Sequence, residues 1–184
     1  MKVLITGASG FIGSKITTWL RTAGHQVIAC VRNPVHFSER FPDISTIQID
    51  FSSERSPETW KPRLAGVDAV INTVGIIRET RSQKFLPLHT EAPSALFEAA
   101  AQAGVQKAVQ ISALGADDKA TTGYHLSKRA ADNFLSTLSI DWNILRPSIV
   151  LGRNGASTAM FLGMAALPVI PLLGNGRQMV QPVH

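Results

Sequence analysis

A glycine-rich segment near the start of the chain, residues 6–13 (TGASGFIG), constrains the fold more than any other feature. It follows a short apolar run that predicts a strand, and it precedes a stretch that predicts a helix. Glycine in this position allows a sharp turn at Gly7, a close backbone approach to a pyrophosphate near Gly10, and packing of helix on strand at Gly13. The amides at a helix N-terminus also bind phosphate. The spacing is GxxGxxG rather than the common GxGxxG, but its place in the chain predicts a dinucleotide-binding loop.

Apolar, β-branched runs alternate with helix-like stretches along most of the chain. The predicted strands are residues 2–5, 26–31, 46–49, 68–74, 107–111 and 142–145. The predicted helices are residues 13–22, 57–64, 91–103 (closed by Gly104) and 123–138, and a loop follows Pro34. Strands joined by crossover helices pair in parallel with right-handed connections. The predicted fold class is therefore α/β, a doubly wound parallel sheet of the Rossmann type, over residues 1–150.

The alternation breaks down in residues 151–184, which we interpret as the start of a substrate-binding region. Within it, residues 159–173 carry no polar side chain. This segment is too short for a membrane span, and Gly163, Pro168 and Pro171 would interrupt a helix there. We expect it to be buried against a substrate site or against further chain.

Composition excludes several classes of protein. With 184 residues, 45% hydrophobic and 17% charged, the chain is a globular domain, and its single cysteine, Cys30, excludes an internal disulfide and a cysteine-built metal site. The formal charge is +5, but the basic residues are spread singly without interleaved aromatic side chains, so we expect no nucleic-acid partner. The single cysteine fits a reducing cytoplasm, and the apolar run at residues 3–5 is too short for a signal peptide, so we expect a cytoplasmic protein. We expect no metal site.

The end of the second predicted strand carries an arginine. In the dinucleotide fingerprint, an acidic residue about twenty positions after the glycines holds the ribose 2′-hydroxyl. This chain has Arg32, and its next carboxylate is Glu39. A guanidinium grips a phosphate and stacks on adenine, which favours NADP over NAD; the alternative is a solvated loop arginine. Asp50 and Phe51, after the third strand, are placed to meet adenine, unless Asp50 simply caps the strand end.

A second motif, YHLSK, lies on the fourth predicted helix. Tyr124, the single tyrosine, and Lys128 stand four positions apart, so they share one helix face. A nearby ammonium lowers the pKa of a phenol, which would make Tyr124 a general acid or base. Ser112 directly follows the fifth strand, where its hydroxyl would bond a substrate carbonyl. A Tyr-x-x-x-Lys motif alone most often indicates two residues on the exposed surface of a helix. The functional interpretation depends on its place in the chain, after the glycine loop and the strand-end serine.

Taken together, TGASGFIG, Ser112 and YHLSK resemble the short-chain dehydrogenase/reductase superfamily. The stretches LHTEAPSALFEAAAQAGV, QISALGADDKATTGYHLSK and ILRPSIVLGRNG resemble its atypical, extended branch, the NAD-dependent epimerase/dehydratase-like proteins related to the 39-kDa NADH dehydrogenase subunit. Similar chains continue beyond a segment like QPVH. The resemblance thus implies that this chain is truncated and lacks part of its substrate domain.

The resemblance also implies the site residues. Ser112, Tyr124 and Lys128 would be catalytic, with Lys128 also holding the nicotinamide ribose and Arg32 meeting the adenosine ribose. His89 stands near the place of an asparagine in classical members, where it would replace a proton relay or, as we favour, cap the helix start. The remaining cofactor residues would be Gly7, Ser9, Gly10, Phe11, Ile12 and Gly13 at the pyrophosphate, Asn72, Val74 and Gly75 after the fourth strand, and Pro147, Ser148 and Ile149 near the carboxamide.

Two functions from different classes follow. The leading one is an NAD(P)-dependent oxidoreductase or epimerase/dehydratase, in which hydride passes between NADP(H) and an oxygen-bearing carbon of a small molecule while Tyr124 moves the hydroxyl proton. The alternative is a non-catalytic NADP-binding subunit or redox sensor. Two kinds of partner are possible: a second copy of the chain, which would form a homodimer, and a respiratory-type complex. The sequence predicts no membrane span.

Overall fold

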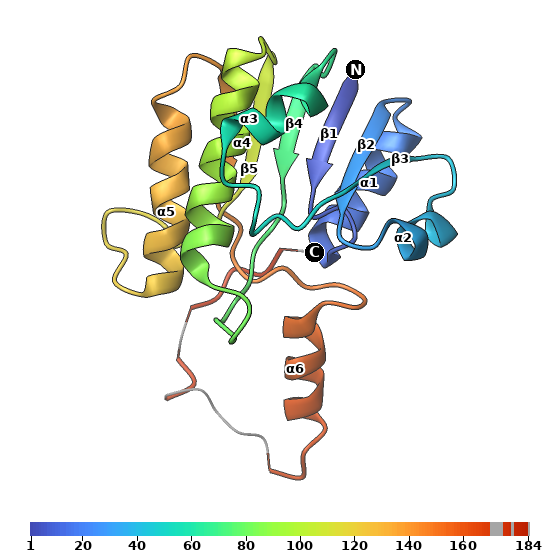
Figure 1. Ribbon diagram of the computed structural model, residues 1–184. Helices are drawn as coiled ribbons and strands as arrows, with labels where there is room; N and C mark the ends of the chain where they lie inside the picture. The colour runs from blue at the N-terminus through green and yellow to red at the C-terminus, as the bar shows by residue number, and fades with distance from the viewer. Residues whose placement is uncertain (170–174, 178, 184) are drawn as a thin grey trace.

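The computed structural model describes residues 1–169, 175–177 and 179–183. Six strands form one parallel sheet in the order β3-β2-β1-β4-β5-β6 (Figure 1). This order confirms the predicted doubly wound Rossmann-type sheet. The strands are β1 (Lys2–Thr6), β2 (Gln26–Val31), β3 (Ser45–Gln48), β4 (Ala69–Asn72), β5 (Lys107–Ile111) and β6 (Asp141–Leu145).

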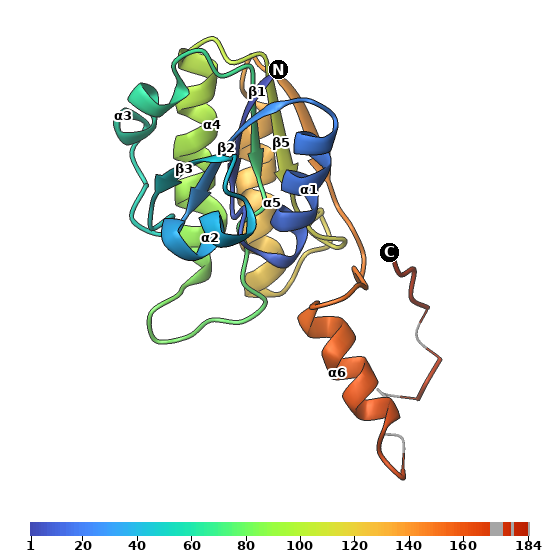
Figure 2. The ribbon, with the colours of Figure 1, turned by 90° about the vertical axis from the view of Figure 1, so that its right-hand side faces the viewer.

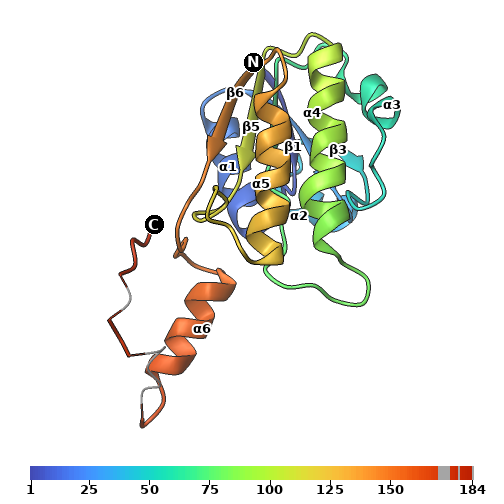
Figure 3. The ribbon, with the colours of Figure 1, turned by 90° about the vertical axis from the view of Figure 1, so that its left-hand side faces the viewer.

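Helices cover both faces of the sheet. Figure 2 shows α1 and α2 on one face, and Figure 3 shows α4 and α5 on the other. The helices are α1 (Phe11–Thr22), α2 (Pro34–Arg40), α3 (Pro57–Trp60), the 3-10 turn η1 (Lys61–Leu64), the π-helical turn η2 (Leu86–Glu91), α4 (Ala92–Gln102), α5 (Gly123–Ser136) and α6 (Ala156–Ala165).

The core forms two layers, one on each face of the sheet. Leu4 packs with Phe97 in the layer under α4 and α5, whereas Ile5 packs with Phe37 in the layer under α1 and α2. Neighbouring residues of a strand point to opposite faces, and both faces are covered here. This double burial explains why the strands read as continuous apolar runs in the sequence.

The predicted loop after Pro34 is wrong, because α2 begins at that residue. The Asn33 side chain accepts a hydrogen bond from the His36 N–H at 3.2 Å, and Pro34 occupies the first helical position. The buried Phe37 anchors this short helix on the sheet. The Asn-Pro pair is a helix-start signal that a pattern based on apolar spacing overlooks.

The predicted helix over residues 91–103 begins earlier in the structure. The turn η2 leads into α4 without a break, so the helical segment starts at Leu86. Its end agrees with the prediction: Gly104 has a φ of +72°, the left-handed conformation that glycine adopts at the end of a helix.

The helix α6 corrects the expectation for residues 159–173. It runs through Gly163, so that glycine does not interrupt it, and it ends before Pro168. None of its residues is buried, and the views show it beyond the carboxyl edge of the sheet (Figures 1 and 3). The expected burial is therefore not found in the described part of this segment, and residues 170–173 lie outside the described ranges.

The final described residues contact the segment that follows β6. Val183 forms an isolated parallel bridge with Val150, which lies between β6 and α6 and outside both. Among the helices of the described ranges, none combines the length and the apolar character that crossing a membrane requires. The division of the chain near residue 150 stays a prediction.

Candidate active site at the carboxyl edge of the sheet

Two neighbouring cavities lie where the strands end. The larger, about 500 Å³, contains Tyr124 and Lys128 and is called the tyrosine cavity here. The smaller, about 220 Å³, contains Arg32 and is called the arginine cavity. The residues that line both are Gly10, Thr73, Gly75 and Ile76. The glycine loop after β1 thus sits between the two cavities.

The glycine loop is shaped by close backbone packing. Gly7 has a φ of +73°, and a Cβ there would lie 2.7 Å from the Thr73 Oγ1. A Cβ on Gly13 would clash with the Gly7 carbonyl oxygen and lie 2.6 Å from the Thr73 Oγ1, so this glycine lets α1 pack against the loop. At Gly10 an added Cβ would meet only the Gly7 carbonyl oxygen, at 3.1 Å, and would otherwise face open space. Gly10 has no side chain and directly precedes the 12-residue helix α1, so a pyrophosphate could approach the backbone amides at the start of this helix.

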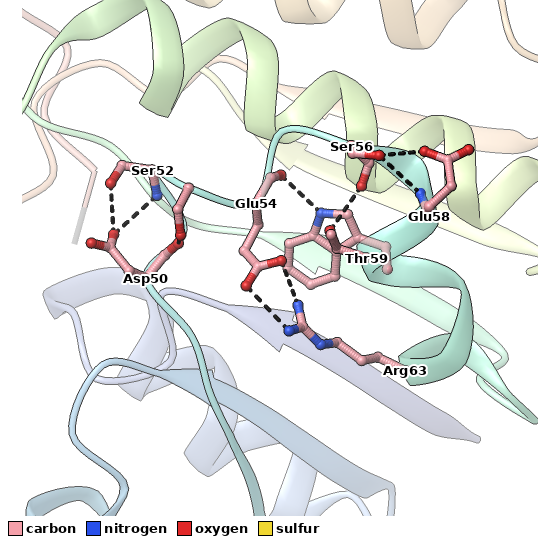
Figure 4. Close-up of polar contacts among 9 residues, drawn as sticks. Asp50, Ser52, Glu54, Ser56, Glu58, Thr59 and Arg63 are labelled. Carbon is pink, nitrogen blue, oxygen red and sulfur yellow. Dashed lines mark hydrogen bonds and ion pairs between the residues drawn. The ribbon is translucent and has the colours of Figure 1, made fainter.

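The arginine cavity carries the two charged residues predicted from the sequence. Arg32 is exposed at the end of β2, and Asp50 follows β3. Asp50 does cap its turn, because its Oδ1 accepts hydrogen bonds from the Ser52 N–H at 3.1 Å and the Ser52 Oγ at 2.7 Å (Figure 4). The predicted cap and the predicted place beside a cofactor are therefore compatible.

A buried tryptophan anchors the segment that follows. The Trp60 Nε1 donates to the Glu54 carbonyl oxygen at 3.1 Å, and the Glu54 carboxylate pairs with Arg63 at 2.8 Å (Figure 4). The Phe51 ring meets the Trp60 ring edge-on, with centroids 5.8 Å apart. This arrangement, which the sequence analysis missed, holds Phe51 in the wall of the arginine cavity.

Lys128 is buried at the base of the tyrosine cavity. Its Nζ donates to the carbonyl oxygens of Val74, at 3.2 Å, and Ile111, at 3.1 Å. Burial lowers the pKa of Lys128 to about 8, and the negative charge of Asp132 opposes this shift. A Cβ on Gly75 would lie 3.1 Å from the Nζ, so the glycine makes room for the ammonium.

Tyr124 lies in the same cavity, one helical turn before Lys128. Its ring meets the rings of His89 and Phe85 edge-on, at centroid distances of 5.5 Å and 5.9 Å. Burial raises the pKa of Tyr124, and this corrects the prediction that Lys128 lowers it. The correction has a geometric reason: the Lys128 Nζ is directed at the two carbonyl oxygens instead.

Ser112 follows β5 and lines the tyrosine cavity, but its proton points away from it. The Ser112 Oγ donates to the Asp132 Oδ2 at 2.7 Å, and the Arg146 Nε donates to the same oxygen at 3.1 Å. The sequence analysis expected a donor to a substrate carbonyl and missed both Asp132 and Arg146. The available signal was spacing, since Asp132 stands four residues after Lys128 on the same helix.

His89 is not the helix cap that we favoured, and the proton-relay role stays a prediction. It lies inside η2, fully buried, and its Nε2 accepts from the Ile76 N–H at 3.0 Å. Its Nδ1 lies 2.9 Å from the Ser127 Oγ, which itself donates to the Tyr124 carbonyl oxygen. Burial lowers the pKa of His89 to about 3, so the ring is neutral with its proton on Nδ1.

The structure brings most predicted site residues to the two cavities. Only Gly13 and Asn72 line neither: Gly13 packs the helix, and the buried Asn72 Oδ1 accepts from the Thr6 Oγ1 at 2.7 Å. The tyrosine cavity is lined by Gly10, Phe11, Ile12, Gly75, Ser112, Tyr124, Lys128, Pro147, Ser148 and Ile149. The arginine cavity is lined by Gly7, Ser9, Gly10, Arg32, Asp50, Phe51, Val74 and Gly75. Lining residues that the sequence analysis missed include Thr73, Ile76, Leu114 and His125.

Known proteins with similar sequences cover the same span. The mitochondrial NADH dehydrogenase (ubiquinone) 1 alpha subcomplex subunit 9 of Rattus norvegicus is 27% identical over 98% of this chain and 49% of its own length. Ceramide reductase of Caulobacter vibrioides is 29% identical over 94% of this chain and 54% of its own length. The chain therefore spans about half the length of these curated relatives.

Solved structures show the same fold. A putative NAD-dependent epimerase/dehydratase from Bacillus halodurans superposes with a TM-score of 0.72 at 23% identity, covering 85% of this chain and 74% of its own. The Bordetella bronchiseptica enzyme WbmG, solved with NAD, gives a TM-score of 0.72 at 18% identity over 90% of this chain and 60% of its own.

A family model described as NAD(P)H-binding matches residues 7–164. This span begins at the first glycine of the loop and includes both cavities as far as α6. The curated relatives include a respiratory-complex subunit, a reductase and, in Bacillus subtilis, a protein named as an uncharacterized sugar epimerase. The chain belongs to the NAD(P)H-binding family.

Proposed function

We propose that the chain is the cofactor-binding part of an NADP(H)-dependent oxidoreductase or epimerase, with Tyr124 as its general acid and base. One observation carries the proposal: Tyr124 and Lys128 line a cavity that shares the glycine loop with the cavity of Arg32. A dinucleotide is long enough to need both cavities, and its reactive end would lie on the side of Tyr124. The substrate is a small molecule with an oxygen-bearing carbon.

Each part of the cofactor has a residue that would hold it. The pyrophosphate would lie over Gly10, the nicotinamide ribose beside Lys128, and the adenosine ribose with its 2′-phosphate beside Arg32. Bound NADP(H) supplies or accepts the hydride. The protein contributes position and charge, and Ile76 and Leu114 supply apolar lining to the tyrosine cavity.

Tyr124 would exchange a proton with the substrate oxygen. Because burial raises the pKa of its phenol, Tyr124 is protonated near neutral pH and is prepared to donate rather than to accept. Ser112 and Lys128 would assist as catalytic residues that touch the substrate and the cofactor.

Titration calorimetry of the purified chain with NADPH and with NADH tests the proposed cofactor. We expect tighter binding of NADPH, since Arg32 stands where a carboxylate would repel the 2′-phosphate. A preference for NADH would overturn the assignment of NADP, and the absence of binding to either nucleotide would overturn the proposed function.

A second candidate is a non-catalytic NADP-binding subunit or redox sensor. The geometry of Ser112 favours it, because a hydroxyl that donates to Asp132 does not donate to a carbonyl. A relative named as a subunit of NADH dehydrogenase is consistent with it, and a respiratory-type partner would be sought by co-purification. The cytoplasmic location and the homodimer stay predictions.

A further inference from the structure

Asp132 is a buried carboxylate beneath the tyrosine cavity, and its side chain is 1% exposed. It lies on α5, and its Oδ2 accepts the hydrogen bonds from Ser112 and Arg146. Its Oδ1 has no hydrogen-bond partner among the described residues. Among the acidic residues that the structure describes, only Asp132 is buried. A charged group so placed is costly unless neighbouring charges balance it.

Two side chains of α5, one turn apart, hold the end of β5. Lys128 donates to the carbonyl oxygen of Ile111, and Asp132 accepts from the hydroxyl of the next residue, Ser112. Lys128 also reaches the Val74 carbonyl after β4. One lysine and one aspartate therefore connect this helix to the strand ends that form the base of the tyrosine cavity.

This arrangement fixes the hydrogen-bonding character of Ser112. A serine hydroxyl has one proton, and it is used in the hydrogen bond to the Asp132 Oδ2. The Ser112 Oγ then offers only its lone pairs to the cavity. Toward a ligand it is an acceptor, suited to the hydroxyl form of a substrate rather than to its carbonyl form.

We propose that Asp132 is a positioning residue that acts through its two neighbours: it orients Ser112 as a hydrogen-bond acceptor and keeps the buried Lys128 charged. The titratable groups near Lys128 are Asp132 from α5, whose negative charge raises the pKa of Lys128, and His89 from η2, which is neutral near pH 7. Tyr124 lines the same cavity and is also neutral at this pH. Arg146, from the end of β6, faces Asp132 itself. Burial raises the pKa of Asp132, whereas the bonds from Ser112 and Arg146 and the charge of Lys128 oppose this rise. When ionised, Asp132 is the negative charge that opposes loss of the Lys128 proton, and its effect on a bound cofactor rests on the proposed function.

The test without any ligand is a pH titration of Lys128 by NMR on protein labelled with ¹³C at lysine Cε, with Lys128→Arg to assign the resonance. In Asp132→Asn, which keeps the shape but removes the charge, we expect the titration midpoint to fall by about one pH unit or more below that of wild type. Asp118→Asn is the matched control, because it removes an exposed carboxylate that pairs with Arg129 on the same helix. An unchanged midpoint in folded Asp132→Asn would overturn the proposal, since a merely structural role leaves it in place.

NADPH affinity measured from pH 6 to pH 10 gives the second readout. Wild type should lose affinity as the pH rises through about 8, where Lys128 loses its proton, and Asp132→Asn should lose it at lower pH. Parallel profiles for the two proteins would contradict the proposal. Wild type that binds no NADPH would overturn the proposed function instead, and the lysine titration would still decide the role of Asp132.

A variant that fails to fold also gives an answer. If Asp132→Asn is unfolded, the double variant Lys128→Met/Asp132→Asn removes the lysine that has lost its counter-charge. Recovery of a cooperative thermal transition in the double variant would support the pairing. An unfolded double variant would overturn it, because the role of Asp132 would then lie in its bonds to Ser112 and Arg146 alone.

Discussion

The two cavities at the carboxyl edge differ in what shapes them. Around the glycine loop the walls are backbone held at close range, with Gly7 and Gly13 both packed against Thr73. Under the tyrosine cavity they depend on buried ionisable side chains, Lys128 and Asp132. The comparison teaches that substitutions on the glycine side act through shape and those on the tyrosine side through charge and protonation.

Gly10→Val is the strongest test of shape. A branched side chain at this position would occupy the space above the loop, so we expect binding of NADPH and NADH to be lost, as measured by calorimetry. The matched control is Gly163→Val, which adds the same side chain on α6 where a Cβ meets nothing within 4 Å. Unchanged affinity in a folded Gly10→Val protein would remove the loop from the site.

Tyr124→Phe is the corresponding test on the tyrosine side. Loss of the phenol proton should lower turnover by about 100-fold or more while NADPH affinity stays nearly unchanged. The measurement uses the full-length protein, either with a substrate found by a screen for NADPH oxidation or by complementation in cells. Full rescue by the phenylalanine variant would favour the sensor over the enzyme.

Arg32→Ala tests whether charge also matters on the glycine side. Loss of the guanidinium should weaken NADPH binding by about 1–3 kcal/mol, the scale of a charge-assisted hydrogen bond, and NADH binding far less. Arg21→Ala provides the control, since Arg21 lies near the far end of α1 and pairs with Asp43. Equal losses for the two nucleotides would mean that Arg32 does not read the 2′-phosphate.

His89 makes the tyrosine side sensitive to acid. Its pKa is lowered from 6.5 to about 3 in the folded protein, so below pH 6.5 the unfolded chain binds a proton that the folded chain does not. The free energy of unfolding should therefore decrease by about 1 kcal/mol per pH unit between pH 6 and pH 5. Urea unfolding of His89→Gln should show a shallower pH dependence, whereas the exposed control His36→Gln should keep the wild-type slope.

The glycine side of the site could be predicted from the sequence more completely than the tyrosine side. A turn that needs glycine, as at Gly7 or Gly104, is set by local backbone sterics, so the loop and the helix end could be predicted from the residue type. The state of a buried polar group depends on partners far along the chain. Ser112 bonds Asp132 twenty residues later, and His89 bonds Ser127 thirty-eight later, which explains why these partners could not be predicted from the sequence.

The most direct test of the account is a crystal structure of the chain grown with NADPH. The account predicts one nucleotide across both cavities, with its pyrophosphate over Gly10, its 2′-phosphate on Arg32 and its nicotinamide ribose beside Lys128. A nucleotide confined to a surface away from the glycine loop, or one bound with its nicotinamide in the arginine cavity, would contradict it.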